Sequence, residues 1–300
     1  MRAPQQDSLC PIDAPTIAPL KTVAVQYGRG SDDGVQLEQA SRVLASEVPI
    51  SLVYNGISHA VMMASPLDVE DFALGFSLSE GILDDAADCY GIEVRTLSHQ
   101  AIGLPEGIDA IEAQLDISSR SFMRLKDRRR SISGRTGCGV CGVESFAGLD
   151  LDAQPVSTRD WIERIDLSTV NRAIDALASH QHLNAQAGAI HAAAWSTLDG
   201  RITDALEDVG RHNALDKLIG RLARQQRLNE PGFVVLSSRG SHELVRKCAR
   251  MDIAALATIS APTAMGVRMA ELTGIRFWGM CRPPKATLYH PGARSASSAT

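Results

Sequence analysis

The sequence has no surplus of basic residues and no long hydrophobic run. Its 300 residues include 30 Lys or Arg and 35 Asp or Glu, giving a formal net charge of −5. That balance argues against general nucleic acid binding, which requires a basic surface. The longest apolar run, 253–267, is interrupted by Pro262 and is too short to cross a bilayer. The N-terminal stretch "MRAPQQDSLCPIDAP" has no apolar segment of the kind found in signal peptides. We therefore expect a soluble, cytoplasmic protein that binds neither nucleic acid nor membrane.

The number of cysteines is ordinary, but the pattern of a disulfide framework is lacking. The sequence has six cysteines without the spacing of a disulfide framework, and one CxxC pair, Cys138 and Cys141. A structural zinc site needs four ligands, and no second CxxC is available to complete one. Zinc would have to recruit ligands from distant segments, so we expect no metal site. The other four cysteines are scattered singly: Cys10, Cys89, Cys248 and Cys281.

The CxxC pair lies in the glycine-rich stretch "RTGCGVCG" at 135–142. A thioredoxin-like disulfide site would open a helix, which Gly139 and Gly142 disfavour by about 1 kcal/mol each. A sulfur-carrying role fits the composition better, because arginines at 128–130 and 135 would favour the reactive thiolate. A persulfide on Cys138 could then pass on its outer sulfur, and attack by Cys141 on the inner sulfur would leave a disulfide.

The first half of the chain is expected to consist of strands around one helix. Two apolar runs surround Asn55-Gly56, which predicts a hairpin, and "IEAQLDI" alternates as a half-buried strand does. A helix is predicted in the stretch that ends at Gly81, and the basic, glycine-rich stretch from Arg124 onward is predicted to be a loop. The predicted division of the chain is a disordered tail at 1–19, an α+β domain at 20–125, a CxxC loop at 126–145, a C-terminal domain at 146–292 and a second tail at 293–300.

The second half predicts an α/β fold. After a hairpin at Asp199-Gly200, helices at 212–227, 242–250 and 263–273 alternate with three strands. This alternation is typical of a parallel sheet with helices on both faces, where ligands bind at the carboxyl ends of the strands. Those ends are 207–213, 237–243, 260–263 and 281–285.

The four strand-end segments share side chains suited to an anion. Taken singly, each could be a helix cap or a solvated charge, but together they predict a site for a nucleotide phosphate. The loops contain neither GxGxxG nor GxxxxGK[ST]. The candidate groups are Arg211, Arg239, Arg282, Lys285, Ser237, Ser238, Ser241, Ser260 and Thr263.

Zinc deaminase chemistry can be tested against the same sequence. Such enzymes need an H-x-E motif followed by P-C-x-x-C. The stretches beginning at His191 and His212 both lack the glutamate, and no cysteine pair follows either. The chemistry is therefore excluded, although a related fold is not.

Three long segments carry a family resemblance. "GRTGCGVCGVES" at 134–145, "EDVGRHNALDKLIG" at 207–220 and the segment at 252–284 resemble the formate dehydrogenase accessory sulfurtransferase family, FdhD/NarQ. The resemblance implies a sulfur carrier between a cysteine desulfurase and the molybdenum cofactor bis-molybdopterin guanine dinucleotide, required for formate dehydrogenase activity. It also implies a homodimer with a smaller, mainly-β N-terminal domain. The C-terminal domain would be a three-layer α/β/α sandwich like that of cytidine deaminase.

The resemblance also implies roles for individual residues. Cys138 would carry the persulfide, with Cys141 as the second thiol. Cofactor binding falls on the stretch Met280, Cys281, Arg282, Pro283, Pro284 and Lys285, together with Arg211, His212, Asn213, Arg239, Ser260 and Thr263. GDP-like nucleotides would mimic the bound cofactor. An alternative from another class is a chaperone that binds the molybdenum cofactor without transferring sulfur.

Overall fold

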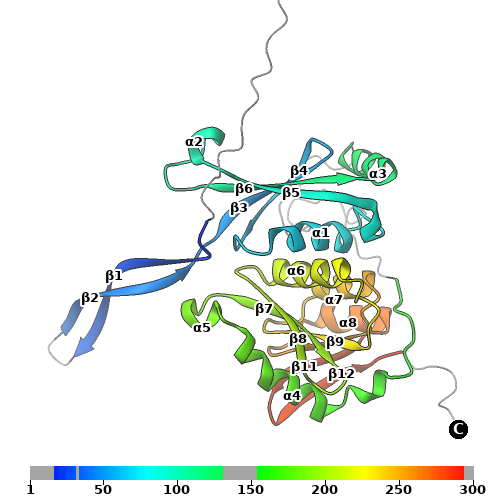
Figure 1. Ribbon diagram of the computed structural model, residues 1–300. Coiled ribbons are helices and arrows are strands. Elements are labelled where there is room, and N and C mark those ends of the chain that lie inside the picture. Colours follow the sequence, from blue (N-terminus) through cyan, green and yellow to red (C-terminus); the bar gives the residue numbers. More distant parts are fainter. Residues whose placement is uncertain (1–16, 32–33, 131–153, 294–300) are drawn as a thin grey trace, which may run out of the picture.

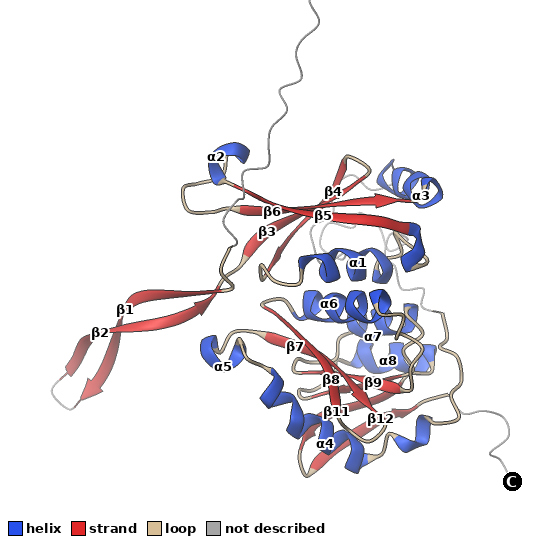
Figure 2. Cartoon of the chain, viewed as in Figure 1, coloured by secondary structure: helices blue, strands red, loops and turns tan. Residues whose placement is uncertain are grey.

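Two β-sheets lie on opposite sides of a shared layer of helices (Figures 1 and 2). The computed structural model describes residues 17–31, 34–130 and 154–293. One sheet belongs to the N-terminal half and the other to the C-terminal half. Helix α1 (Val69–Ser79) covers the first sheet and packs against α6 (Arg211–Arg224), which covers the second.

The N-terminal sheet has four strands in the order β4-β3-β6-β5. Strands β3 and β6 are parallel, whereas β4 and β5 pair antiparallel to their neighbours. The predicted hairpin is confirmed, because Asn55 and Gly56 both adopt positive φ angles, of 45° and 80°. The elements are β3 (Val48–Tyr54), β4 (Ile57–Ala64), β5 (Cys89–Leu97), the short helix α2 (His99–Ile102), and β6 (Ala110–Ile117).

A separate two-stranded hairpin precedes this sheet. Strands β1 (Leu20–Ser31) and β2 (Gly34–Ala45) pair antiparallel and project from the body as an arm (Figure 1). This hairpin was not predicted, although Val23, Val25 and Tyr27 recur at the two-residue spacing of a strand.

The basic stretch after Arg124 corrects one prediction. We expected a loop from Arg124 onward, but helix α3 (Ser119–Arg130) continues through these residues. Arginine and lysine are good helix formers, and Leu125 anchors the helix in the core with 2% exposure. Arg124 also pairs with Asp84. The predicted domain boundary at 125/126 therefore falls inside a helix.

The C-terminal sheet has six strands in the order β12-β11-β10-β9-β7-β8. Strands β9, β10 and β11 are parallel, and antiparallel strands flank them on both sides. Helices lie on both faces of this sheet (Figure 1), as the predicted α/β fold requires. The likeness to the cytidine deaminase fold stays a prediction. The remaining elements are α4 (Leu167–Leu177), α5 (Asn184–Ala187), β7 (His191–Thr197), β8 (Ile202–Asp208), β9 (Gly232–Leu236), α7 (His242–Arg250), β10 (Ala255–Thr258), α8 (Ala264–Thr273), β11 (Arg276–Arg282) and β12 (Lys285–Pro291).

Helix α4 was not predicted from the sequence. Its Val170, Ala173, Ile174 and Leu177 recur at helical spacing and are buried against the sheet. Asp166 caps the helix by accepting a hydrogen bond from the backbone N–H of Thr169 at 2.8 Å.

Buried and half-buried charged side chains at the contact between the two halves fix their relative position. Arg221 on α6 donates to Asp71 on α1 at 2.6 Å. Lys247 on α7 donates to Asp216 on α6 at 2.8 Å and lies 2.7 Å from Glu80, which follows α1. Buried pairs of this kind specify geometry, since a misplaced partner leaves an unpaired charge.

The most deeply buried pair joins Lys217 and Asp208. Their charged atoms lie 2.7 Å apart and both side chains are fully buried. Lys217 also donates to the backbone oxygen of Ser65 at 3.2 Å, which ties the N-terminal half to the C-terminal half. Lys217→Met should lower the free energy of unfolding by about 3 kcal/mol, because it leaves Asp208 buried without its cation.

Urea unfolding measures that loss. The matched control is Arg268→Met, which removes an exposed ion pair with Glu271 at 2.9 Å and should cost no more than about 1 kcal/mol. Equal losses for the two variants would contradict the role given to Lys217.

Candidate functional site

The four predicted strand-end loops meet at one edge of the C-terminal sheet. Strand β7 is antiparallel to both β8 and β9, so the carboxyl ends of β8, β9, β10 and β11 point the same way. Backbone hydrogen bonds join the loops directly: Thr263 N–H donates to the oxygen of Gly240 at 2.9 Å, and Met280 N–H donates to that of Ser260 at 3.2 Å. This edge, made of residues 207–213, 237–243, 260–263 and 280–285, is called the strand-end edge below.

Two arginines give the strand-end edge its positive charge. Arg211 is half-buried at the first position of α6, and Arg239 is exposed on the loop after β9. Burial and the nearby Arg239 lower the pKa of Arg211, which shows that both groups share one region. The Nε of Arg211 is shielded from solvent and has no hydrogen-bond partner among the described residues. A phosphate oxygen would supply the missing acceptor.

A histidine and a glutamate lie beside these arginines. His212 Nε2 lies 3.1 Å from Glu243 Oε2, and Ser241 Oγ donates to the same oxygen at 2.9 Å. The hydrogen bond from His212 lowers the pKa of Glu243 to about 2. His191, at the start of β7, faces the same group, and its pKa is lowered by burial and by Arg211. The sequence missed Glu243 and His191 as site residues, because only the fold brings them to His212.

The hydroxyl group of Thr263 in the third loop has a structural role. Thr263 Oγ1 caps α8 by accepting a hydrogen bond from Gly266 N–H at 3.0 Å. The backbone oxygen of Ser260 accepts a hydrogen bond from Thr258 Oγ1 at 3.0 Å, and its side chain is half-buried. For Thr263 the simpler interpretation, a helix cap, is therefore what the structure shows.

The stretch 280–285 comprises the end of β11, the turn at 283–284 and the first residue of β12. Arg282 and Lys285 are paired across this turn and both side chains are exposed. Asn171 on α4 donates to the backbone oxygen of Pro284 at 3.0 Å, which holds the turn against the body. Met280 is 40% exposed and has a positive φ of 53°. Of this stretch, the two cationic side chains are the ones suited to an anion.

Two predicted binding residues have buried side chains that serve the fold. Cys281 is fully buried, and burial raises the pKa of its thiol to about 12. Asn213 is 4% exposed, and its amide donates to the backbone oxygen of Met63 at 2.8 Å and to Asp208 at 3.0 Å. Both side chains are committed to packing or internal hydrogen bonds, so they shape the edge without presenting a group to a ligand.

Cys138 and Cys141 lie outside the described residues. The segments on either side of them contact the opposite end of the molecule from the strand-end edge (Figure 1). Arg124 of α3 and Arg250, the last residue of α7, both pair with Asp84. Ser157 N–H donates to Asp252, just after α7, at 2.6 Å. Helix α7 thus begins at the strand-end edge. It ends close to Arg124 and Ser157, which are called the anchors of the cysteine segment (131–153) because they lie on either side of it in the chain.

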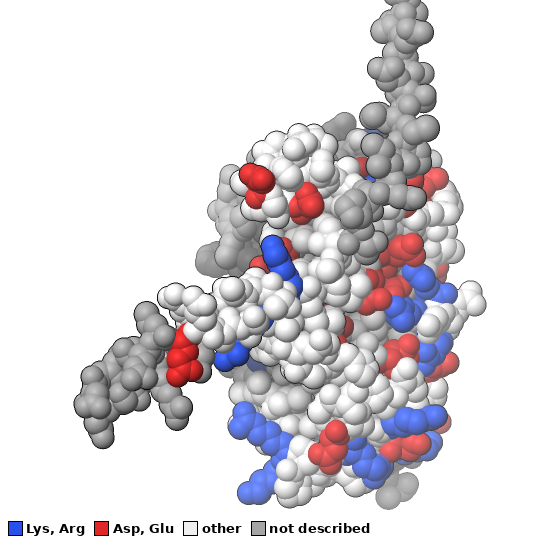
Figure 3. All heavy atoms as spheres, turned by 60° about the vertical axis from the view of Figure 1, so that its left-hand side comes forward, with Lys and Arg blue, Asp and Glu red and all other residues white. Residues whose placement is uncertain are grey.

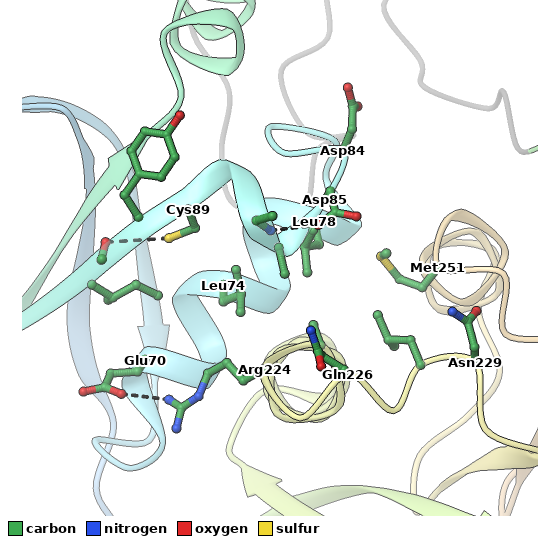
Figure 4. A pocket seen from close by; sticks show the side chains of 17 residues that line it. Glu70, Leu74, Leu78, Asp84, Asp85, Cys89, Arg224, Gln226, Asn229 and Met251 are labelled. Carbon is green, nitrogen blue, oxygen red and sulfur yellow. Dashed lines mark hydrogen bonds and ion pairs between the residues drawn. The ribbon is translucent and has the colours of Figure 1, made fainter.

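A pocket of about 590 Å³ opens at that opposite end, beside the last turn of α6 (Figure 4). Apolar side chains such as Leu74 and Met251 line it, and an ion pair of 2.7 Å between Arg224 and Glu70 lies on its wall. The thiol of Cys89 also lines it, but burial raises the pKa of that thiol. Cys89 is therefore a poor nucleophile, since the thiolate is the attacking form.

The described residues contain no group of three or more His, Cys, Asp or Glu side chains placed to hold a metal ion. None of the described helices is long and apolar enough to cross a membrane. On the face drawn in Figure 3, much of the described surface is uncharged, and along its right-hand side basic side chains lie beside acidic ones. That face therefore offers no continuous basic tract of the kind that binds nucleic acid.

The comparisons with known proteins agree with the resemblance found in the sequence. A family model described as the FdhD/NarQ family matches residues 45–296. The chain is 49% identical over 250 residues to "Sulfur carrier protein FdhD" of Chromobacterium violaceum, covering 83% of this chain and 88% of that protein. It is 45% identical over 279 residues to the protein of the same name from Bordetella petrii, covering 93% and 95%.

A solved structure shares the fold. It comes from Desulfotalea psychrophila and is described as a formate dehydrogenase accessory protein. The two structures superpose with a TM-score of 0.65 over 90% of this chain and 97% of that one. The sequence identity is 19%, so this likeness supports the fold and nothing further.

Proposed function

Because the chain belongs to the FdhD/NarQ family, we propose that it is a sulfur carrier in the maturation of formate dehydrogenase. In this proposal it takes persulfide sulfur from a cysteine desulfurase and passes it to bis-molybdopterin guanine dinucleotide. The observation that carries the proposal is the CxxC pair within a family match of 252 residues, whose curated relatives are named sulfur carriers. A homodimer and a cytoplasmic location remain predictions.

The proposed chemistry begins at Cys138. Its thiolate attacks the outer sulfur of the desulfurase persulfide, forming a Cys138 persulfide and releasing the desulfurase thiolate. Attack by the Cys141 thiolate on the inner sulfur of Cys138 then breaks the S–S bond and expels hydrosulfide toward the cofactor. This second step leaves a Cys138–Cys141 disulfide, and a dithiol reductant must supply two electrons to reset the pair.

The strand-end edge would bind the cofactor, which is the substrate of this transfer. The nucleotide parts of the cofactor carry diphosphates. Hydrogen-bond donors and positive charge for these diphosphates come from Arg211, Arg239, Arg282 and Lys285. The unpartnered Nε of Arg211 is the most specific of these features. A GDP-like nucleotide should therefore bind at this edge in place of the cofactor.

The chain between Arg130 and Cys138 can be compared in length with helix α7. Cys138 is eight residues beyond Arg130, so it can lie up to about 27 Å from the end of α3. Helix α7 has nine residues and spans about 13 Å. The greatest reach of this segment is therefore about twice the length of α7.

Mass spectrometry tests the carrier chemistry. After incubation with a cysteine desulfurase and free cysteine, the peptide holding Cys138 and Cys141 should gain one sulfur that reductant removes. No gain, with the desulfurase active on another acceptor, would contradict sulfur transfer and favour the cofactor-binding chaperone. Cys248 serves as the internal control, since it is fully buried with a raised pKa and should gain no sulfur.

A further inference from the structure

Glu243 is out of place in a site for anions. Apart from two buried carboxylates, the charged groups of the strand-end edge are cationic, and a carboxylate among them should weaken phosphate binding by direct repulsion. Its pKa of about 2 means that Glu243 is ionised at neutral pH. The other two carboxylates of the edge are buried and have partners of their own: Glu207 accepts hydrogen bonds from the backbone N–H groups of Leu183 and Asn184 at 2.8 and 2.9 Å, and Asp208 lies 2.7 Å from Lys217. Glu243 has no such buried cation, so its presence needs another explanation.

The contacts of Glu243 supply one. Its Oε2 accepts hydrogen bonds from Ser241 Oγ at 2.9 Å and from His212 Nε2 at 3.1 Å. The side chains of Glu243 and His212 are 19% and 23% exposed, so the pair is partly shielded from water. Because Nε2 is committed to the carboxylate, the other ring nitrogen of His212, Nδ1, is the one left for a ligand.

The charge on His212 decides what Nδ1 can do. In the neutral ring with a proton on Nε2, Nδ1 carries a lone pair and repels a phosphate oxygen. In the imidazolium, Nδ1–H is a donor and the ring is positive. An ionised carboxylate on Nε2 stabilises the imidazolium.

We propose that Glu243 is a positioning residue that holds His212 as an imidazolium, with Nδ1–H available to a phosphate group of the nucleotide at the strand-end edge. This inference rests on the proposed function of that edge. It assigns to His212 a donor atom and a charge state, and to Glu243 a role without contact to the ligand.

The other charged groups around His212 make this counter-charge necessary. Arg211 is its neighbour on α6, and His191 faces it from β7. Arg239 from the loop after β9 adds positive charge beside Arg211, and His242 does so beside Glu243. Each of these groups, when positive, opposes protonation of His212, whereas Glu243 favours it.

Isothermal titration with inorganic pyrophosphate and with GDP at neutral pH tests the proposal. The variants are Glu243→Gln, His212→Gln and the double variant. Glu243→Gln should weaken binding of both ligands about tenfold, the loss of one charge-assisted hydrogen bond. The double variant should bind no more weakly than His212→Gln, because Glu243 acts through His212.

The sign of the effect makes the test decisive. Simple removal of a negative charge would tighten pyrophosphate binding, so tighter or unchanged binding by Glu243→Gln would overturn the proposal. A loss confined to GDP would also overturn it, since that would indicate contact with the base. Glu271→Gln, which removes an exposed carboxylate of α8, should bind both ligands as the wild-type protein does.

Two further measurements keep the outcome clear. If the unmodified protein bound neither ligand, the proposed cofactor site would fail, and the role of Glu243 would fail with it. If Glu243→Gln did not fold, the pH dependence would decide instead. Pyrophosphate binding by the wild-type protein should weaken as the pH rises more than binding by His212→Gln does, because only the wild-type protein has an imidazolium to lose. Parallel pH profiles would overturn the proposal.

Discussion

Replacing Cys138 by alanine is expected to abolish activation of a co-produced formate dehydrogenase while leaving GDP binding unchanged. The variant lacks the thiolate that would accept sulfur, so no persulfide can form for transfer. The strand-end edge that would bind the nucleotide lies across the molecule from the anchors of the cysteine segment, so its affinity should be unaffected. The measurements are client enzyme activity and GDP affinity on the same preparations.

Cys89→Ala is the matched control for Cys138→Ala. Cys89 is a free, half-buried thiol whose pKa is raised by burial, so its loss should leave activation unchanged. Full activation by Cys138→Ala would remove sulfur transfer from the proposed function and leave the chaperone alternative. Loss of GDP binding by Cys138→Ala would instead show that the cysteine segment forms part of the nucleotide site.

Local signals in the sequence predicted one hairpin of the N-terminal half and much of the C-terminal half. Asn55-Gly56 and Asp199-Gly200 predict hairpins because few residues tolerate a positive φ, and both hairpins are present. The helix predicted at 242–250 has those bounds in the structure. The strand-end edge followed from a general rule of open α/β sheets, and the loops expected there do meet.

Features that depend on distant residues were missed. The basic stretch of α3 was predicted to be a loop because it has few apolar residues, although arginine and lysine are good helix formers, and the pairing of Arg124 with Asp84, forty residues earlier, was not foreseen. Asn213 looked like a ligand-binding residue, but its partners are a backbone oxygen of β4 and Asp208. Glu243 and His212 are 31 residues apart and meet because α6 and α7 begin side by side. No local pattern carries such information.

The contact between α1 and α6 gives the largest expected loss of stability. The two helices pack through Gly75 and Gly220, so that their backbones nearly touch. A Cβ on Gly220 would lie 2.7 Å from the carbonyl carbon of Asp71 and 2.9 Å from the nitrogen of Gly75, and closer still to the Asp71 oxygen. These atoms belong to backbone, so no side-chain rotation can relieve the overlap. The helices would have to separate, which would also pull Arg221 away from Asp71.

Gly220→Ala should therefore lower the free energy of unfolding by more than about 3 kcal/mol in urea. In an isolated helix the same substitution would stabilise by about 1 kcal/mol, so the sign distinguishes packing from helix propensity. Gly91→Ala is the control: Gly91 has no atoms within 4 Å of an added Cβ, and the change should lie within about 0.5 kcal/mol of zero. A stabilised Gly220→Ala would mean that α1 and α6 do not meet at these glycines, and the shared layer between the two sheets would have to be redrawn.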